Sequence, residues 1–144
     1  MLLDVNVCFA ASWADHQDHE AARGWIDDAA DDSLGICRIT QLGWLRLLPN
    51  QSSMGSAALT RREAWEFVAA MLADSRFVYL DEPPDLAAEF GRLSATDDHA
   101  HKLWTDDYLA AFALSGDLEL VTLDTKFESR YPGLAVLIPG RDPH

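Results

Sequence analysis

The hydrophobic residues of this chain occur in two patterns. Short, nearly continuous apolar runs are typical of buried strands, whereas apolar residues repeated every three or four positions indicate one face of a helix. The runs predict strands at residues 1–4, 34–37, 77–80, 118–123 and 134–138. The periodic segments between them predict helices at residues 5–13, 15–27, 40–48, 60–71, 83–93, 105–113 and 125–131.

The order of these elements predicts the fold class. Strands that alternate with helices form a parallel sheet, because each helix returns the chain to the same end of the sheet, and the helices then cover both faces. Residues 1–144 contain no internal repeat, low-complexity tract or linker. We therefore expect one α/β domain with a central parallel β-sheet flanked by helices on both faces, and a loose tail after about residue 139.

The composition is that of a single globular domain. At 144 residues with 49% hydrophobic content, the chain is long enough for one substantial core. No apolar run approaches the roughly 20 residues that cross a bilayer, and no basic segment precedes the first strand, so we expect a soluble, cytoplasmic protein that does not contact membranes. Cys8 and Cys37 lie among apolar neighbours, which predicts buried thiols rather than a disulfide.

Three aspartates lie where the predicted elements bring functional groups together. Asp4 ends the first strand, Asp124 follows the fourth, and Asp106 opens the helix predicted at 105–113. In an open α/β sheet such groups gather at the carboxyl ends of the strands. With no lysine nearby to pair with them, the carboxylates repel one another unless a hard divalent cation joins them. The pattern predicts a Mg²⁺ or Mn²⁺ site, although each aspartate alone also suits a helix start.

The formal net charge of −13 limits the ways in which this chain can bind nucleic acid. Non-specific affinity comes mainly from Lys and Arg at phosphates, and this chain has 11 of them against 24 Asp and Glu. Two interpretations are open. Either the metal and a local arginine patch overcome the overall field, or the acidic surface binds a basic protein partner.

Four segments of the chain resemble the PIN-domain ribonucleases, specifically the small VapC-like toxins of bacterial toxin–antitoxin pairs. The resemblance covers essentially the whole chain and rests on the order and spacing of the segments. They are Leu3-Asp4-Val5-Asn6-Val7, Thr40-Gln41-Leu42-Gly43-Trp44-Leu45-Arg46-Leu47-Leu48, Thr105-Asp106-Asp107-Tyr108-Leu109-Ala110-Ala111 and Val121-Thr122-Leu123-Asp124.

The resemblance implies Mg²⁺- or Mn²⁺-dependent cleavage of RNA by a metal-activated water. Asp4, Asp106 and Asp124 match three of the acids that hold the metal and carry catalysis in that family. Asn6 matches a small polar residue after the first acid, and Thr122 matches a hydroxyl residue that commonly lines the pocket. The resemblance also implies a cognate antitoxin protein as partner, and we expect a homodimer.

The sequence departs from the family pattern at Gly43, where many relatives carry a glutamate. Asp107 is one replacement for the missing acid, but neighbouring helix positions point about 100° apart. Arg46, one turn after Gly43, either holds a substrate phosphate or an active-site acid, or extends its charge into water. A missing ligand predicts weak metal binding, which Gly43→Glu is expected to tighten.

Two other functions are compatible with the sequence. One is a catalytically weak or inactive PIN-fold module that binds proteins, which the absent carboxylate and the acidic charge favour. The other is a metal-dependent phosphatase or phosphoacceptor, but Asp4-Val5-Asn6 lacks the second carboxylate of an Asp-x-Asp motif. The sequence does not specify the RNA target, the number of metal ions or the identity of the antitoxin.

Overall fold

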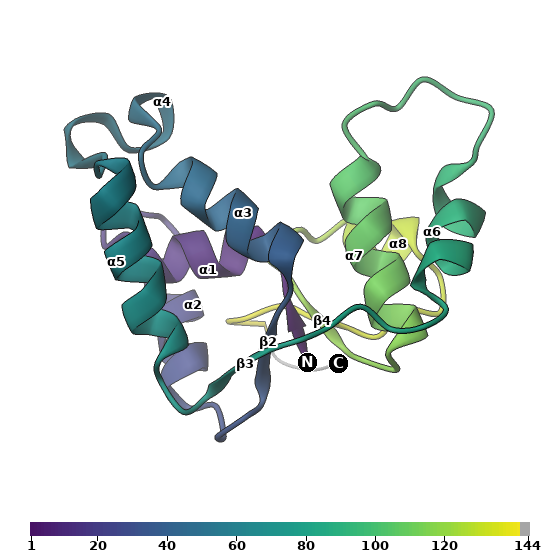
Figure 1. Ribbon diagram of the computed structural model, residues 1–144, viewed down its shortest axis with the longest axis horizontal. Coiled ribbons are helices and arrows are strands. Elements are labelled where there is room, and N and C mark those ends of the chain that lie inside the picture. The colour runs from purple at the N-terminus through teal and green to yellow at the C-terminus, as the bar shows by residue number, and fades with distance from the viewer. Residues whose placement is uncertain (142–144) are drawn as a thin grey trace.

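The computed structural model describes residues 1–141, which contain one parallel sheet of five strands (Figure 1). The strands lie in the order β3-β2-β1-β4-β5, so the first strand of the chain is at the centre of the sheet. They are β1 (Leu2–Leu3), β2 (Leu34–Ile36), β3 (Phe77–Tyr79), β4 (Leu120–Val121) and β5 (Val136–Leu137). Leu2 pairs with Gly35 on one side and with Leu120 on the other. The predicted parallel sheet is confirmed.

Helices connect the strands and cover both faces of the sheet. They are α1 (Val5–Ser12), α2 (His19–Asp27), α3 (Arg38–Leu47), α4 (Gln51–Met54), the 3₁₀ helix η1 (Gly55–Ala57), α5 (Arg61–Leu72), α6 (Leu86–Ser94), α7 (Trp104–Ser115) and α8 (Phe127–Arg130). Successive side chains of a strand point to opposite faces. Accordingly, Leu3 packs in an apolar cluster with α1, α2, α3 and α5, and Leu2 packs in another with α6, α7 and α8. Figure 1 shows these two groups of helices on the left and on the right.

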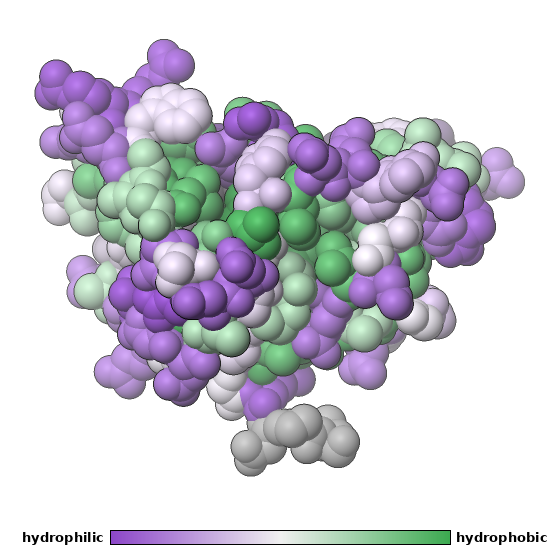
Figure 2. Space-filling model, turned by 60° about the horizontal axis from the view of Figure 1, so that its bottom comes forward, coloured by the Kyte–Doolittle hydropathy of each residue, from purple (hydrophilic) through white to green (hydrophobic). Residues whose placement is uncertain are grey.

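Some large hydrophobic side chains stay on the surface. Figure 2 shows one face on which hydrophobic residues run across the middle and hydrophilic residues gather on both sides. Among the described residues, the exposed large hydrophobic side chains are Leu42, Trp65, Tyr79 and Trp104. Single exposed residues of this kind are common on monomers. The homodimer expected from the sequence stays a prediction.

Several helices begin at residues other than those predicted. α3 begins at Arg38 rather than at Thr40, and the Thr40 hydroxyl donates to the Leu3 carbonyl at 2.8 Å instead of capping the helix. α2 begins at His19 rather than at residue 15, and α6 begins at Leu86 rather than at residue 83. At α3 the Thr40 side chain bonds to a distant strand, so the local pattern alone does not determine where this helix begins.

The chain between α3 and α5 contains a short helix that was not predicted. This helix, α4, is capped by Asn50, whose side chain accepts from the Ser52 amide at 2.9 Å. A capping box then begins α5, where a helix was predicted at residues 60–71. The Glu63 amide donates to the Thr60 hydroxyl at 3.2 Å, and the Thr60 amide donates to the Glu63 carboxylate at 2.7 Å.

The remaining predictions concern the thiols, the membrane and the tail. Cys8 and Cys37 are buried and free, as expected. Within residues 1–141 no helix is long and apolar enough to cross a membrane. Pro139 is buried, and the Arg141 amide donates to the Ile138 carbonyl at 3.1 Å, so the tail is still attached at this point. Most of the predicted loose tail, residues 142–144, lies outside the described residues.

Candidate functional site

The site begins where β1 and β4 end side by side. The parallel pairing of Leu3 with Val121 continues into the Asp4 amide, which donates to the Val121 carbonyl at 2.9 Å. Asp4 and Thr122 are therefore neighbours on adjacent strand ends, and both are buried. The Thr122 hydroxyl donates to the Asp4 carboxylate at 2.8 Å. Strand pairing alone thus places the first acid against the predicted hydroxyl residue.

Asn6 fixes the direction of the Thr122 proton. The Thr122 oxygen accepts from the Asn6 amide group at 3.0 Å and from the Asp124 backbone amide at 3.1 Å. With both acceptor positions used, the single hydroxyl proton of Thr122 points to Asp4. The Asn6 side-chain oxygen also accepts from the Leu123 amide at 3.0 Å, which holds the segment after β4 against α1. Asn6 and Thr122 therefore orient two of the predicted acids.

Arg130 joins the other two predicted acids. Its Nη1 donates to Asp106 at 2.8 Å and lies 3.6 Å from a carboxylate oxygen of Asp124. The guanidinium carbon lies 5.7 Å from the centre of the Phe127 ring and 5.9 Å from that of Tyr131. The sequence pattern did not indicate Arg130, and the cation considered beside an active-site acid was Arg46. The signal was a basic residue at the end of the short helix that directly follows Asp124.

The acids influence each other electrostatically. The pKa of Asp4 is raised to about 6, mainly by burial; the hydrogen bond from Thr122 opposes this shift, and the charges of Asp106 and Asp124 contribute to it. Burial also raises the pKa of Asp106, where Arg130 opposes the shift and the charge of Asp124 adds to it. The three carboxylates from β1, α7 and the end of β4 therefore lie in one electrostatic environment.

The donor atoms fit a hard divalent cation, but a cation of the protein occupies part of the site. Within residues 1–141 no group of three or more His, Cys, Asp or Glu side chains is arranged to hold a metal ion. The charge between Asp106 and Asp124 is instead the Arg130 guanidinium. Carboxylate oxygens are the ligands that Mg²⁺ and Mn²⁺ prefer. Asp4, Asp106 and Asp124 therefore supply the right kind of donor atom, with Arg130 paired to two of them.

Two supporting residues predicted from the sequence make other contacts. Asp107 accepts a hydrogen bond from the Tyr131 hydroxyl at 2.6 Å and lines the neighbouring cavity, while its charge contributes to the raised pKa of Asp106. Arg46 is exposed, and within residues 1–141 no ion pair connects it to an acid. The structure therefore favours the interpretation in which Arg46 extends into water.

Gly43 has a packing role that the sequence did not indicate. A Cβ atom at this position would lie 2.5 Å from Cγ2 of Val5, closer than side chains approach one another. The β-branched Val5 side chain is stiff and cannot easily turn away. Gly43 therefore lets α3 approach α1. The tighter metal binding expected of Gly43→Glu stays a prediction, and the new side chain would also press against Val5.

The comparisons with known proteins identify the family. The profile of the PIN domain matches residues 1–131. The chain belongs to the PIN-domain family. Ribonuclease VapC41 of Mycobacterium tuberculosis is 42% identical to it over 139 residues, which cover 93% of this chain and 94% of the relative. The family predicted from the four sequence segments is confirmed.

Solved structures share this PIN fold at low sequence identity. Mycobacterium tuberculosis VapC20, a toxin that cleaves the sarcin-ricin loop, has a TM-score of 0.65 at 15% identity and covers 89% of this chain and 92% of its own. A toxin–antitoxin complex from Klebsiella pneumoniae has a TM-score of 0.58 at 21% identity, with 94% of both chains covered. These similarities establish the fold alone.

Proposed function

We propose that this chain is the toxin of a toxin–antitoxin pair and cleaves RNA with the help of Mg²⁺ or Mn²⁺. The observation that carries the proposal is the convergence of Asp4, Asp106 and Asp124, from three separate elements, at the carboxyl edge of the sheet. Membership of the PIN-domain family and the identity to a relative named as a ribonuclease support it. An enzyme that acts on phosphodiester bonds needs such an acidic site more than a binding module does.

The three acids share one role in this proposal. Asp4, Asp106 and Asp124 would hold the metal ion directly or through water. When bound, the ion lowers the pKa of a water molecule and neutralises charge on the phosphate. Thr122 and Asn6 keep the Asp4 carboxylate and the segment before Asp124 in place. With a pKa of about 6, Asp4 is mostly ionised at pH 7, and a nearby cation favours its charged form further.

Arg130 neutralises two of the acids and is positioned to meet the substrate. Its side chain is only 26% exposed and lies against two aromatic rings, so it is held at the edge of the site. A guanidinium matches the geometry of a phosphate oxygen pair. We expect Arg130 to leave Asp106 and Asp124 when the metal binds and to contact the scissile phosphate. A local arginine would then offset part of the −13 net charge.

A protein partner completes the proposal. The acidic site attracts a cation, and Leu42 on α3 is half exposed. An antitoxin with an apolar segment beside α3, and with an Arg or Lys among the three acids, would displace the metal. Apolar contact would then supply most of the affinity and the charge would supply the inhibition. Antitoxin binding, like the homodimer, is a proposal for this chain.

A specific observation also favours a second function. Arg130 occupies the space between Asp106 and Asp124, and Gly43 carries no acid. A PIN-fold binding module that has lost metal and catalysis would have these features. In that case the acidic edge would serve protein association only.

Cleavage of RNA by the purified protein separates the two functions. We expect the wild type to cleave single-stranded and looped RNA in Mg²⁺ or Mn²⁺, to stop in EDTA, and to recover when metal is restored. Asp124→Asn, purified in the same way, controls for contaminating nucleases. Metal-independent cleavage, or equal cleavage by Asp124→Asn, would contradict the proposed enzyme. No cleavage of any RNA in either metal would favour the binding module.

A further inference from the structure

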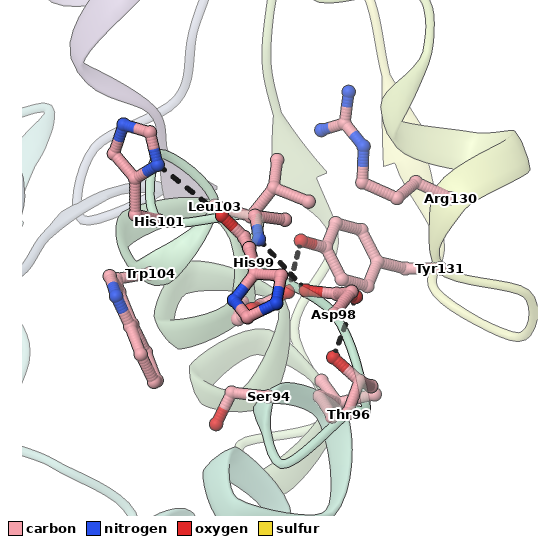
Figure 3. A pocket seen from close by; sticks show the side chains of 12 residues that line it. Ser94, Thr96, Asp98, His99, His101, Leu103, Trp104, Arg130 and Tyr131 are labelled. Carbon is pink, nitrogen blue, oxygen red and sulfur yellow. Dashed lines mark hydrogen bonds between the residues drawn. The ribbon is translucent and has the colours of Figure 1, made fainter.

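A cavity of about 590 Å³ lies next to the proposed active site (Figure 3). It is enclosed by the loop between α6 and α7, by the first turns of α7, and by Arg130 and Tyr131 at the end of α8. This volume is within the range of pockets that hold small ligands. None of the functions assigned to the three acids uses this cavity. Its position and lining therefore need a separate explanation.

The cavity offers a flat aromatic surface. Trp104, the first residue of α7, lines it and is 57% exposed. The Trp104 ring meets Phe90 edge to face, with 6.3 Å between ring centres, which supports the indole without covering it. An indole exposed in this manner is suited to stack on another planar group. The bases of single-stranded RNA stack on aromatic side chains in this way.

The polar lining offers hydrogen-bond donors rather than free acids. His99 and His101 lie on the loop; Figure 3 shows His99 near the centre of the view and His101 at its upper left, where Nδ1 of His101 lies 3.3 Å from the His99 carbonyl oxygen. Asp98 also lines the cavity, but its two oxygens accept from the Thr96 hydroxyl at 2.8 Å and from the Ala100 amide at 2.9 Å. The Asp98 carboxylate thus shapes the loop. Imidazole groups on a loop held in this way can bond to the edge of a base.

The cavity and the acids share one wall. Arg130 lines the cavity and donates to Asp106, while Asp107, the next residue of α7, lines the cavity and accepts from Tyr131. A nucleotide whose base enters the cavity therefore has its phosphate within reach of Arg130 and Asp106. A peptide would use the stacking surface and the imidazoles less fully than a base does.

We propose that this cavity is a nucleotide subsite, in which an unpaired base next to the scissile phosphate stacks on Trp104 and bonds to His99 or His101. The subsite rests on the proposed ribonuclease function and deepens it by making the substrate single-stranded at this position. The α6–α7 loop then contributes to the choice of RNA sequence. Contacts with the base would supply RNA affinity that a chain with a net charge of −13 does not obtain from attraction to the phosphates.

RNA binding without cleavage tests the subsite directly. Fluorescein-labelled ten-nucleotide RNAs of U, A, C or G are titrated with the full chain in EDTA and low salt, and binding is followed by fluorescence anisotropy. Loss of one stacked base weakens binding by roughly five- to a hundredfold. We expect Trp104→Leu to lose affinity within this range and Trp104→Phe to keep most of it. His99→Ala with His101→Ala, on the exposed loop, is a second variant, and it should change the preference among the four RNAs.

Trp65 provides a matched control on α5. It is 52% exposed, almost as much as Trp104, but it does not line the cavity. We expect Trp65→Leu to bind RNA like the wild type. In steady-state cleavage, Trp104→Leu should raise KM and change kcat little. Thermal unfolding of each variant checks that the fold is retained.

Each outcome decides between the subsite and the proposed function. If the wild type cleaves RNA but Trp104→Leu and the histidine variant bind RNA as it does, the subsite is wrong and the ribonuclease stands. If the wild type neither binds nor cleaves RNA, both are wrong. If Trp104→Leu keeps its RNA affinity but loses binding to a cognate antitoxin protein that the wild type binds, the cavity is a protein-binding site and the nucleotide subsite is overturned.

Discussion

Helices α3 and α7 both begin at the carboxyl edge of the sheet, on opposite faces, but only α7 brings carboxylates to the site (Figure 1). Its first turn carries Asp106, which contacts Arg130, and Asp107, which contacts Tyr131. The second turn of α3 carries Gly43, packed against Val5. At this edge of the sheet, α7 therefore carries charged residues of the site, whereas α3 packs against α1.

The difference follows from what each helix must bury. α3 places Trp44 in the core, where its indole N–H donates to the Ser12 hydroxyl at 2.8 Å, and its close approach to α1 leaves no room for a side chain at position 43. α7 buries only its middle, residues 109–113, so its first turn is free to carry charge. A metal ion bound at this edge would therefore take its protein ligands from the end of β1, from α7 and from the segment after β4, without help from α3.

The largest expected effect is at α7, where neighbouring acids have different roles. Asp106→Asn removes a proposed metal ligand and should lower RNA cleavage by about a hundredfold or more, since even residues that only orient metal ligands contribute 10- to 100-fold. Asp107→Asn is the matched control, and it should lower cleavage by less than about tenfold. Rates measured in Mg²⁺ for both variants check this. Equal losses would mean that cleavage depends on negative charge at the start of α7 in general and not on Asp106 as a metal ligand.

The next effect concerns the buried acid between the two helices. The folded state raises the pKa of Asp4 from 3.8 to about 6, so the folded protein binds its proton more tightly than the unfolded chain. The contribution of Asp4 to stability is therefore greatest at low pH and falls as the pH rises from about 4 to 6. Asp4→Asn should raise the free energy of unfolding at pH 7 by at most about 3 kcal/mol, and this gain should vanish near pH 4. Urea unfolding in EDTA at both pH values measures it, and a gain of the same size at both would contradict the pKa shift.

Packing on the α3 side can be broken with a single methyl group. Gly43→Ala places a Cβ against Val5 and should lower the free energy of unfolding by about 1–3 kcal/mol. Gly24→Ala, on α2, is the control, because no atom lies within 4 Å of its new Cβ. That change should stabilise the protein by roughly 0.5–1 kcal/mol, as helix propensity predicts. If both variants unfold alike, the close approach of α3 to α1 does not explain the glycine.

The smallest expected effect is on metal affinity through Arg130. Arg130→Gln removes the cation that competes for Asp106 and Asp124, and we expect Mn²⁺ to bind about tenfold more tightly, equivalent to ~1.4 kcal/mol. The same variant should be less stable than the wild type in EDTA, because the acids then repel each other unscreened. Arg92→Gln, which breaks only the pair with Glu89 on α6, should change neither quantity. Unchanged Mn²⁺ affinity in Arg130→Gln would show that the arginine and the metal do not compete.

The local sequence pattern predicted the class of fold, but it did not predict where each helix begins. Alternating apolar runs and helical repeats indicated a parallel sheet with helices on both faces, because strand and helix periods are properties of neighbouring residues. The start of α3 at Arg38 did not follow, since Thr40 bonds to the Leu3 carbonyl of a strand far away in the chain. Element ends depend on such distant partners.

In the candidate site, too, some positions were predictable from the sequence and some contacts were not. The positions of Asp4, Asp106 and Asp124 at one edge followed from strand ends and helix starts, and Thr122 and Asn6 lie beside them as expected. Their roles in metal binding and catalysis stay predictions. Arg130 was missed because only the turn of α8 brings it back to the acids, and the contact of Gly43 with Val5 was missed because it depends on the distance between two helices.

Titration of the protein with Mn²⁺, followed by calorimetry, tests most directly whether the three carboxylates form one metal site. We expect the wild type to bind Mn²⁺ with weak affinity, in the range up to millimolar, and Asp4→Asn, Asp106→Asn and Asp124→Asn each to weaken binding by about tenfold or more. Asp107→Asn should bind like the wild type. Absence of Mn²⁺ binding to the wild type at millimolar concentration, or binding that none of the three substitutions changes, would contradict a metal site at this edge of the sheet.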